Sequence, residues 1–137
     1  MTYDIIDKAT EFSRDFEVDP KLKEGVSGKA LLEKTIDFLH EELNETKEAV
    51  EVDDMAEIID GFGDVAFVAL NGIYKSFRFK GASHEEAKAN AQEVMRRICS
   101  ANLGKKQADG TIKYINGKVQ KPDGWTAPAY DDILLTA

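Results

Sequence analysis

Two short acidic segments contain the residues whose types and spacing best suit chemistry. The first is Glu41-Glu42-Leu43-Asn44-Glu45, and the second is Glu57-Ile58-Ile59-Asp60-Gly61-Phe62-Gly63-Asp64. Side chains three or four residues apart share one face of a helix, so Glu42 would lie beside Glu45. The same spacing aligns Glu57, Asp60 and Asp64 on the second segment. Each segment therefore predicts a stripe of carboxylates.

A short acidic link, Glu51-Val52-Asp53-Asp54, joins the two segments. A link of this length folds two helices into an antiparallel hairpin, so the two stripes can meet. Carboxylates that meet repel one another and shift their pKa values unless a cation neutralises them. Hard oxygen ligands suit Mg²⁺, with Mn²⁺ as an alternative. The sequence thus predicts a magnesium site with five candidate ligands: Glu42, Glu45, Glu57, Asp60 and Asp64.

Each candidate ligand also has an ordinary interpretation. Glu42 and Glu45 would line a solvated helix face, and Glu57 would form a capping pair with Asp54. Asp64 fits such an interpretation least, because it lies in an apolar run without a basic residue nearby in sequence. Burial of an uncompensated charge costs several kcal/mol. Asp64 is therefore the strongest functional candidate.

Apolar residues at helical spacing predict four helices that position these segments, at about residues 2–16, 28–50, 55–80 and 83–102. A break is expected at Asp19-Pro20. The third helix is apolar on most sides, which predicts that it is buried, and its one polar stripe continues to Asn71. Gly61 and Gly63 each cost up to about 1 kcal/mol within a helix. They predict close approach of a neighbouring backbone or a ligand.

The chain after residue 103 differs in composition. Turn dipeptides predict irregular chain with a short hairpin around Ile112 to Val119, and Trp125 suggests that this tail is pinned. Cys99, just before it, is expected in the core. The tail is basic, which fits either a solvated segment or a cover for bound phosphates. Its lysines are Lys105, Lys106, Lys113, Lys118 and Lys121. We expect an all-α fold, a four-to-five-helix antiparallel bundle in a single domain over 1–137, with a helical body (1–103) and a tail (104–137).

Charge and composition exclude several classes. A net charge of −8 over 137 residues argues against a surface that coats nucleic acid or an anionic membrane. The start of the chain lacks the basic and apolar pattern of a signal peptide. The longest apolar-rich stretch, Val65 to Ile73, is too short to span a bilayer. A single cysteine fits a reducing compartment. A soluble cytoplasmic protein is predicted.

With these residues in view, the chain resembles the MazG-like all-α nucleoside-triphosphate pyrophosphohydrolases, a group that includes phosphoribosyl-ATP pyrophosphohydrolase. Glu42-Leu43-Asn44-Glu45 matches the E-x-x-E half of their signature, and Asp64-Val65-Ala66-Phe67 matches the aspartate of E-x-x-D with its apolar neighbours. The glutamate expected before that aspartate falls on Gly61, where Asp60 could replace it. The register Glu57-Ile58-Ile59-Asp60 is the alternative. A phage and bacterial branch is the nearest, because Gly117-Lys118-Val119-Gln120-Lys121-Pro122 matches its closing motif, while the segment from Ser100 to Lys105 departs by one residue.

The resemblance implies magnesium-dependent hydrolysis of a nucleoside triphosphate to the monophosphate and pyrophosphate. The expected substrate is a dNTP. Either Glu41 or Glu45 would accept the proton of the attacking water. Substrate contacts would come from Asn71, Asn102, Lys105, Lys118 and Lys121. The resemblance further implies a homodimer or homotetramer, in the cytoplasm of a bacterium or of the host if a phage encodes the chain.

Two other classes remain open at this point. A non-catalytic helical interaction protein would show solvated, scattered carboxylates. A di-iron carboxylate bundle requires E-x-x-H pairs, and the sequence offers only Asp37-x-x-His40 as a near match.

Overall fold

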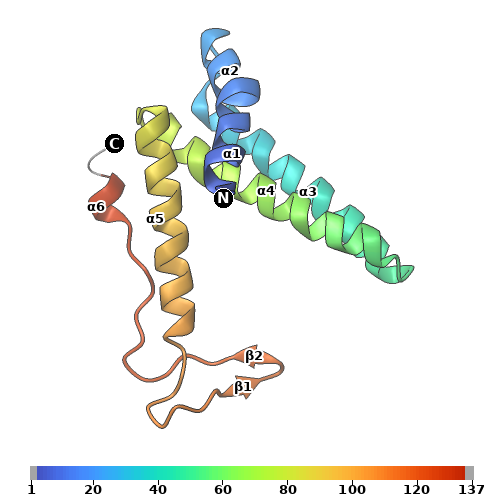
Figure 1. The fold of residues 1–137 in the computed structure, drawn as a ribbon, viewed down its shortest axis with the longest axis vertical. Coiled ribbons are helices and arrows are strands. Elements are labelled where there is room, and N and C mark those ends of the chain that lie inside the picture. Colours follow the sequence, from blue (N-terminus) through green and yellow to red (C-terminus); the bar gives the residue numbers. More distant parts are fainter. Residues whose placement is uncertain (1–2, 135–137) are drawn as a thin grey trace. The chain divides into compact units, whose positions relative to one another are not determined.

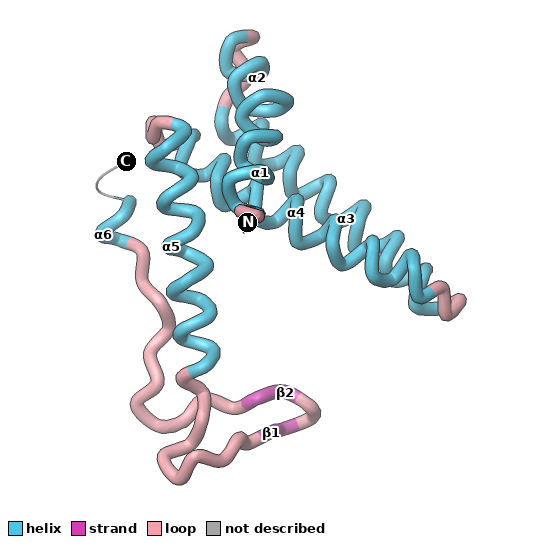
Figure 2. The backbone as a smooth tube through the Cα atoms, viewed as in Figure 1, coloured by secondary structure: helices cyan, strands magenta, loops and turns pink. Residues whose placement is uncertain are grey.

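The structure is a computed structural model that describes residues 3–134 (Figure 1). Its helices and strands, in chain order, are α1 (Ile5–Phe12), a π-helical segment η1 (Ser13–Val18), α2 (Asp19–Lys23), α3 (Gly28–Glu51), α4 (Met55–Phe79), α5 (His84–Leu103), β1 (Tyr114–Ile115), β2 (Lys118–Val119) and α6 (Asp131–Leu134). The predicted all-α class with an irregular C-terminal region is confirmed (Figure 2). The chain forms two compact units that meet in sequence between Ala91 and Gln92.

The first helical stretch is longer than the sequence predicts. Asp4 caps α1 because its Oδ1 accepts a hydrogen bond from the backbone N–H of Asp7 at 2.9 Å. The chain then stays helical through η1 and α2, so the predicted break at Asp19-Pro20 is wrong. Pro20 lies in the first turn of α2, directly after the π-helical segment η1. The predicted start at residue 2 lies outside the described residues.

Helices α3 and α4 form an antiparallel hairpin, seen side by side in Figure 1. Ser27 caps α3, since its Oγ accepts from the backbone N–H of Ala30 at 3.1 Å. Asp54 caps α4 by accepting from the N–H of Glu57 at 3.2 Å. The tight link between the helices passes through Asp53, whose φ is 54°. Both predicted helices and the capping pair of Asp54 and Glu57 are confirmed.

Small residues set the register and the close spacing of this hairpin. A Cβ atom added at Gly61 would lie 2.2 Å from Oγ1 of Thr46, which is too close for any side chain. One at Gly72 would lie 3.4 Å from Cγ2 of Thr35, an ordinary contact. A close neighbour is thus present at Gly61, but it is the Thr46 side chain rather than the predicted backbone or ligand, whereas a Cβ added at Gly63 would meet nothing within 4 Å.

The prediction that the third helix is buried is wrong for the first half of α4 and confirmed for its second half. Ile59 and Phe62 of α4 are 65% and 61% exposed, and Met55 is similarly open. The first half of α4 has α3 on one side, and these three apolar side chains stay exposed within residues 3–134. The second half is enclosed as well by the N-terminal helices, and it contains the buried Tyr74 and Phe77.

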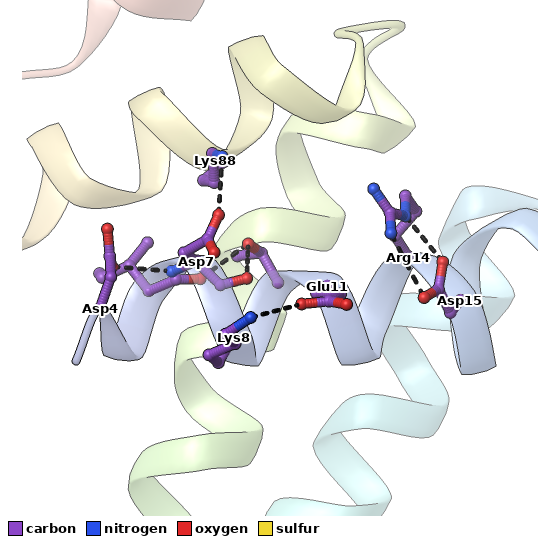
Figure 3. A network of polar contacts seen from close by, with 9 residues as sticks. Asp4, Asp7, Lys8, Glu11, Arg14, Asp15 and Lys88 are labelled. Atoms are coloured by element: carbon purple, nitrogen blue, oxygen red, sulfur yellow. Dashed lines mark hydrogen bonds and ion pairs between the residues drawn. The ribbon is translucent and has the colours of Figure 1, made fainter.

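Polar contacts fasten α1 to the start of α5 within the first unit. The Lys88 ammonium donates to Oδ1 of Asp7 at 2.9 Å (Figure 3). This contact holds the pKa of Asp7 below its ordinary value. A capping box begins α5, because the Ser83 and Glu86 side chains each accept a hydrogen bond from the other residue's backbone N–H at 3.2 Å.

The second unit contains the rest of α5, a short hairpin and α6. Strands β1 and β2 pair antiparallel around a turn at Asn116 and Gly117, both at positive φ, which confirms the predicted hairpin. Trp125 Nε1 donates to the carbonyl oxygen of Ala101 at 2.7 Å, so the tail is pinned to the end of α5. Cys99 is exposed, and its predicted place in the core is wrong. Among the described residues, no helix has both the length and the apolar character that a bilayer span requires.

Candidate functional site

The α3–α4 hairpin brings Glu42 and Asp64 together. Thr46 and Gly61 touch across the two helices, and Glu42 lies one turn before Thr46 on α3, while Asp64 lies nearly one turn after Gly61 on α4. Burial raises the pKa of Glu42, and Asp64 makes the largest electrostatic contribution to the rise. Three further carboxylates add smaller contributions: Glu45, Glu41 and Asp60. We call Glu42 and Asp64 the acidic pair.

Nothing in residues 3–134 neutralises the acidic pair by an ion pair. No group of three or more His, Cys, Asp or Glu side chains in this part of the chain is arranged to hold a metal ion. Mg²⁺ does not need such a cage, because proteins commonly hold it with one or two carboxylates while water and substrate phosphates complete its octahedron. The acidic pair fits Mg²⁺ in donor type and in charge.

A cavity of about 290 Å³ opens beside the acidic pair, between the N-terminal helical stretch and the α3–α4 hairpin. Phe12, Phe38 and Phe67 supply its aromatic walls. The rings of Phe12 and Phe67 lie 5.2 Å apart between centroids, with their planes tilted by 59°. Small-molecule sites in proteins usually hold roughly 300–1,000 Å³, so the cavity suits a small planar group.

Three polar residues line the same cavity: Glu17, Asn71 and Lys75. We call them the buried polar cluster. The Lys75 side chain is 4% exposed, and its ammonium donates to Oε2 of Glu17 at 2.8 Å and to Oγ1 of Thr35 at 2.9 Å. Asn71 is 2% exposed, and neither Nδ2 nor Oδ1 has a hydrogen-bond partner within residues 3–134. The cavity thus combines a carboxylate pair, aromatic walls and an unsatisfied amide.

The other predicted acidic residues lie elsewhere on the hairpin. Glu45 and Glu57 line a separate open cavity of about 360 Å³, near the link between α3 and α4. Glu41 and Asp60 are exposed. Their negative charges help to raise the pKa of Glu42. Of the five predicted ligands, only Glu42 and Asp64 line the same cavity as the buried polar cluster.

The predicted substrate contacts of the tail all belong to the second unit. Lys105 and Lys121 lie over the ring of Trp125, with Nζ 5.3 and 5.0 Å from its centroid. Lys118 is exposed on β2, and the amide of Asn102 donates to the carbonyl of Ile98 at 2.9 Å. Two of the lysines thus have a structural contact of their own, whereas the Lys118 side chain has open solvent around it.

Two residues of the cavity, Glu17 and Lys75, were not predicted from the sequence. Lys75 lies four residues after Asn71, so it continues the polar stripe of α4, and a lysine in an apolar helix is a signal that could have been read. Glu17 gave no such signal, because it comes from a distant segment with ordinary surface composition. Its pairing with Lys75 depends on how the N-terminal helices pack on α4.

No protein-family model matches the chain, and neither a curated protein nor a solved structure matches it. The resemblance to MazG-like pyrophosphohydrolases accordingly stays a prediction that rests on its motif residues. The geometry and chemistry of the cavity are the basis for assigning a function.

Proposed function

We propose that this chain hydrolyses a nucleoside triphosphate between its α and β phosphates in the presence of Mg²⁺. The observation that carries the proposal is the cavity that Glu42 and Asp64 share with an unsatisfied buried amide and three phenylalanine rings. Carboxylates suit a cation that accompanies phosphates, and aromatic walls suit a planar base. A nucleotide with its metal has both parts. The products would be a nucleoside monophosphate and pyrophosphate.

In this proposal Glu42 and Asp64 would hold Mg²⁺, which supplies neutralisation of the triphosphate and a lower pKa for a bound water. Glu45 would accept the proton from the attacking water. We favour Glu45 over Glu41 because Glu45 contributes more than Glu41 to the raised pKa of Glu42. Asp60 and Glu57 would add negative charge near the acidic pair.

The tail would contribute phosphate contacts through Lys118, whose ammonium has no structural partner among the described residues. Lys105, Lys121 and Asn102 would have a smaller part, because each already makes a contact within the second unit. The expected homodimer or homotetramer belongs to the same proposal. It draws support from the exposed apolar residues of α4, since Met55, Ile59 and Phe62 recur at helical spacing.

The same apolar stripe favours a second candidate, a non-catalytic helical protein that binds a partner through α4. Exposed apolar stripes of this kind commonly mark interaction surfaces. This candidate does not account for the unpaired acidic pair or for the unsatisfied Asn71. It predicts that the chain binds a partner and lacks hydrolytic activity.

Release of pyrophosphate from a panel of dNTPs and NTPs tests the proposal. We expect pyrophosphate and monophosphate in equal amounts with Mg²⁺, and none with excess chelator. Absence of turnover on every triphosphate, or release of orthophosphate and diphosphate instead, would refute it.

A further inference from the structure

The unsatisfied amide of Asn71 is an unusual feature of the buried polar cluster. More than nine in ten buried polar groups in proteins have a hydrogen-bond partner. Asn71 is 2% exposed, yet its Nδ2 and Oδ1 both lack a partner in the described part of the chain. The residue lines the cavity, so a ligand in that cavity can supply the missing donor and acceptor. The amide thus presents one donor and one acceptor side by side.

Lys75 adds a donor next to this amide. It lies one helical turn after Asn71 and lines the same cavity. An ammonium group has three hydrogens, and the bonds to Glu17 and Thr35 use two of them. The third has no partner among the described residues, and an ammonium cannot accept a hydrogen bond. A carbonyl oxygen placed there would be attracted, whereas an amino group would bring donor against donor.

The spacing of Asp64 and Asn71 fits an elongated ligand with a cation-bound phosphate at one end and a flat group at the other. Asp64 and Asn71 are seven residues apart on α4, which places them on nearly the same face and about 10 Å apart along the axis. Phe12, Phe38 and Phe67 line the space beside them. Aromatic side chains stack on the flat face of any nucleobase, whichever donors and acceptors the base carries on its edge. Any discrimination between bases must therefore come from the polar cluster.

We infer that Asn71 and Lys75 form a subsite that selects nucleobases with a lactam edge over those with an amidine edge. A lactam edge has a ring N–H beside a carbonyl, as in uracil, thymine, guanine and hypoxanthine. An amidine edge has an unprotonated ring nitrogen beside an amino group, as in cytosine and adenine. Asn71 can pair with either edge by rotating its amide, so Lys75 makes the choice. This inference rests on the proposed nucleotide substrate and names its base class.

Two pairs of nucleosides of nearly identical shape test the inference: deoxyuridine against deoxycytidine, and inosine against adenosine. Binding to the full chain is measured by NMR titration, with the side-chain amide signal of Asn71 as the reporter. We expect the lactam member of each pair to bind about tenfold more tightly or better, as for one charge-assisted hydrogen bond. Equal affinities would overturn the inference. Tighter binding of deoxycytidine and adenosine would overturn it too, because it would show that the Glu17 carboxylate meets the base.

Two variants separate a recognition role from a structural one. Asn71→Leu removes an amide that has no partner in the described residues, so its Tm should match or exceed that of the natural chain, while deoxyuridine binding falls about tenfold or more. Lys75→Met should abolish the preference between the members of each pair. The exposed Asn44→Leu on α3 is the control and should bind deoxyuridine normally. A lower Tm for Asn71→Leu with unchanged binding would overturn the inference.

The nucleosides carry no phosphate, so the result of this binding experiment does not depend on whether the chain hydrolyses triphosphates. Pyrophosphate release without a base preference would remove the subsite and leave the hydrolytic function standing. A lactam preference without hydrolysis would support the subsite and refute the hydrolytic function. The comparison of nucleoside pairs on the natural chain decides the inference even if a variant does not fold.

Discussion

Glu42 on α3 and Asp64 on α4 line the same cavity, and the charge of Asp64 contributes more than any other carboxylate to the raised pKa of Glu42. The relationship depends on the register of the hairpin, in which Thr46 meets Gly61. Two like charges are thereby held together without a cation from residues 3–134. Such an arrangement costs stability in the absence of a ligand, and a bound cation would recover it.

Magnesium should therefore raise the Tm of the protein. We expect Glu42→Gln to raise the Tm of the metal-free protein and to remove most of its response to millimolar Mg²⁺, because the variant lacks one of the repelling charges. Thermal unfolding with and without Mg²⁺ provides the measurement. Glu33→Gln is a matched control on the same helix, outside the acidic pair, and should keep the full response. An identical Mg²⁺ response in the natural chain and Glu42→Gln would count against the site.

The acidic pair should also impose a pH dependence on the metal-free protein. The pKa of Glu42 lies above its ordinary value of 4.5, so the folded state binds the proton more tightly than the unfolded state does. The free energy of unfolding should then fall as the pH rises from 4.5 through the raised pKa. Denaturant unfolding between pH 4 and 7 measures this trend. The difference in stability between Glu42→Gln and the natural chain should grow with pH, and a constant difference would contradict the assignment.

The close approach of α3 and α4 predicts opposite effects for two neighbouring glycines. Gly61→Ala places a Cβ against Oγ1 of Thr46 and should destabilise the fold by about 1–3 kcal/mol. Gly63→Ala meets open space and should stabilise the helix by up to about 1 kcal/mol. Chemical denaturation of both variants is the measurement. Adding Thr46→Ala should relieve much of the cost of Gly61→Ala, and a lack of coupling would show that the contact is not tight.

The exposed lysine of β2 provides a separate test of the tail. If Lys118 binds a phosphate, Lys118→Ala should lower kcat/KM for a triphosphate about ten- to a hundredfold and leave the Mg²⁺ response of the Tm intact. Lys113→Ala, in the same segment, is the control. Unchanged kinetics in a variant that lacks Lys105, Lys118 and Lys121 together would exclude the tail from catalysis.

The sequence predicted the helices near the site well, because their signals are local. Ser27, Asp54 and Ser83 cap α3, α4 and α5 as residues of these types do. The π-helical passage from α1 into α2 was missed, since the Asp19-Pro20 signature marks a helix start whether or not a helix precedes it. The exposure of Ile59 and Phe62 could not be predicted either. A helix face that packs in the core of its own chain and one that binds another molecule have the same apolar sequence pattern.

The site was predictable in its acidic half and not in its buried half. Helical spacing placed Asp64 in a polar stripe with Asn71, and the structure puts both in one cavity. The same spacing could not show that Glu42 and Asp64 line one cavity while Glu45 and Glu57 line another, since this depends on how the hairpin is rotated. The contact of Glu17 with Lys75 joins residues 58 positions apart, and no local pattern encodes such a pairing.

Triphosphate hydrolysis should depend on the Mg²⁺ that the acidic pair would hold, and one comparison tests this most directly. Pyrophosphate release is measured under kcat/KM conditions for the natural chain, Asp64→Asn and Glu57→Gln, all with Mg²⁺. We predict a loss of about a thousandfold or more for Asp64→Asn, since several kcal/mol of charge stabilisation depend on the metal, and less than about tenfold for Glu57→Gln. Equal losses for the two variants, or full activity in Asp64→Asn, would contradict the claim.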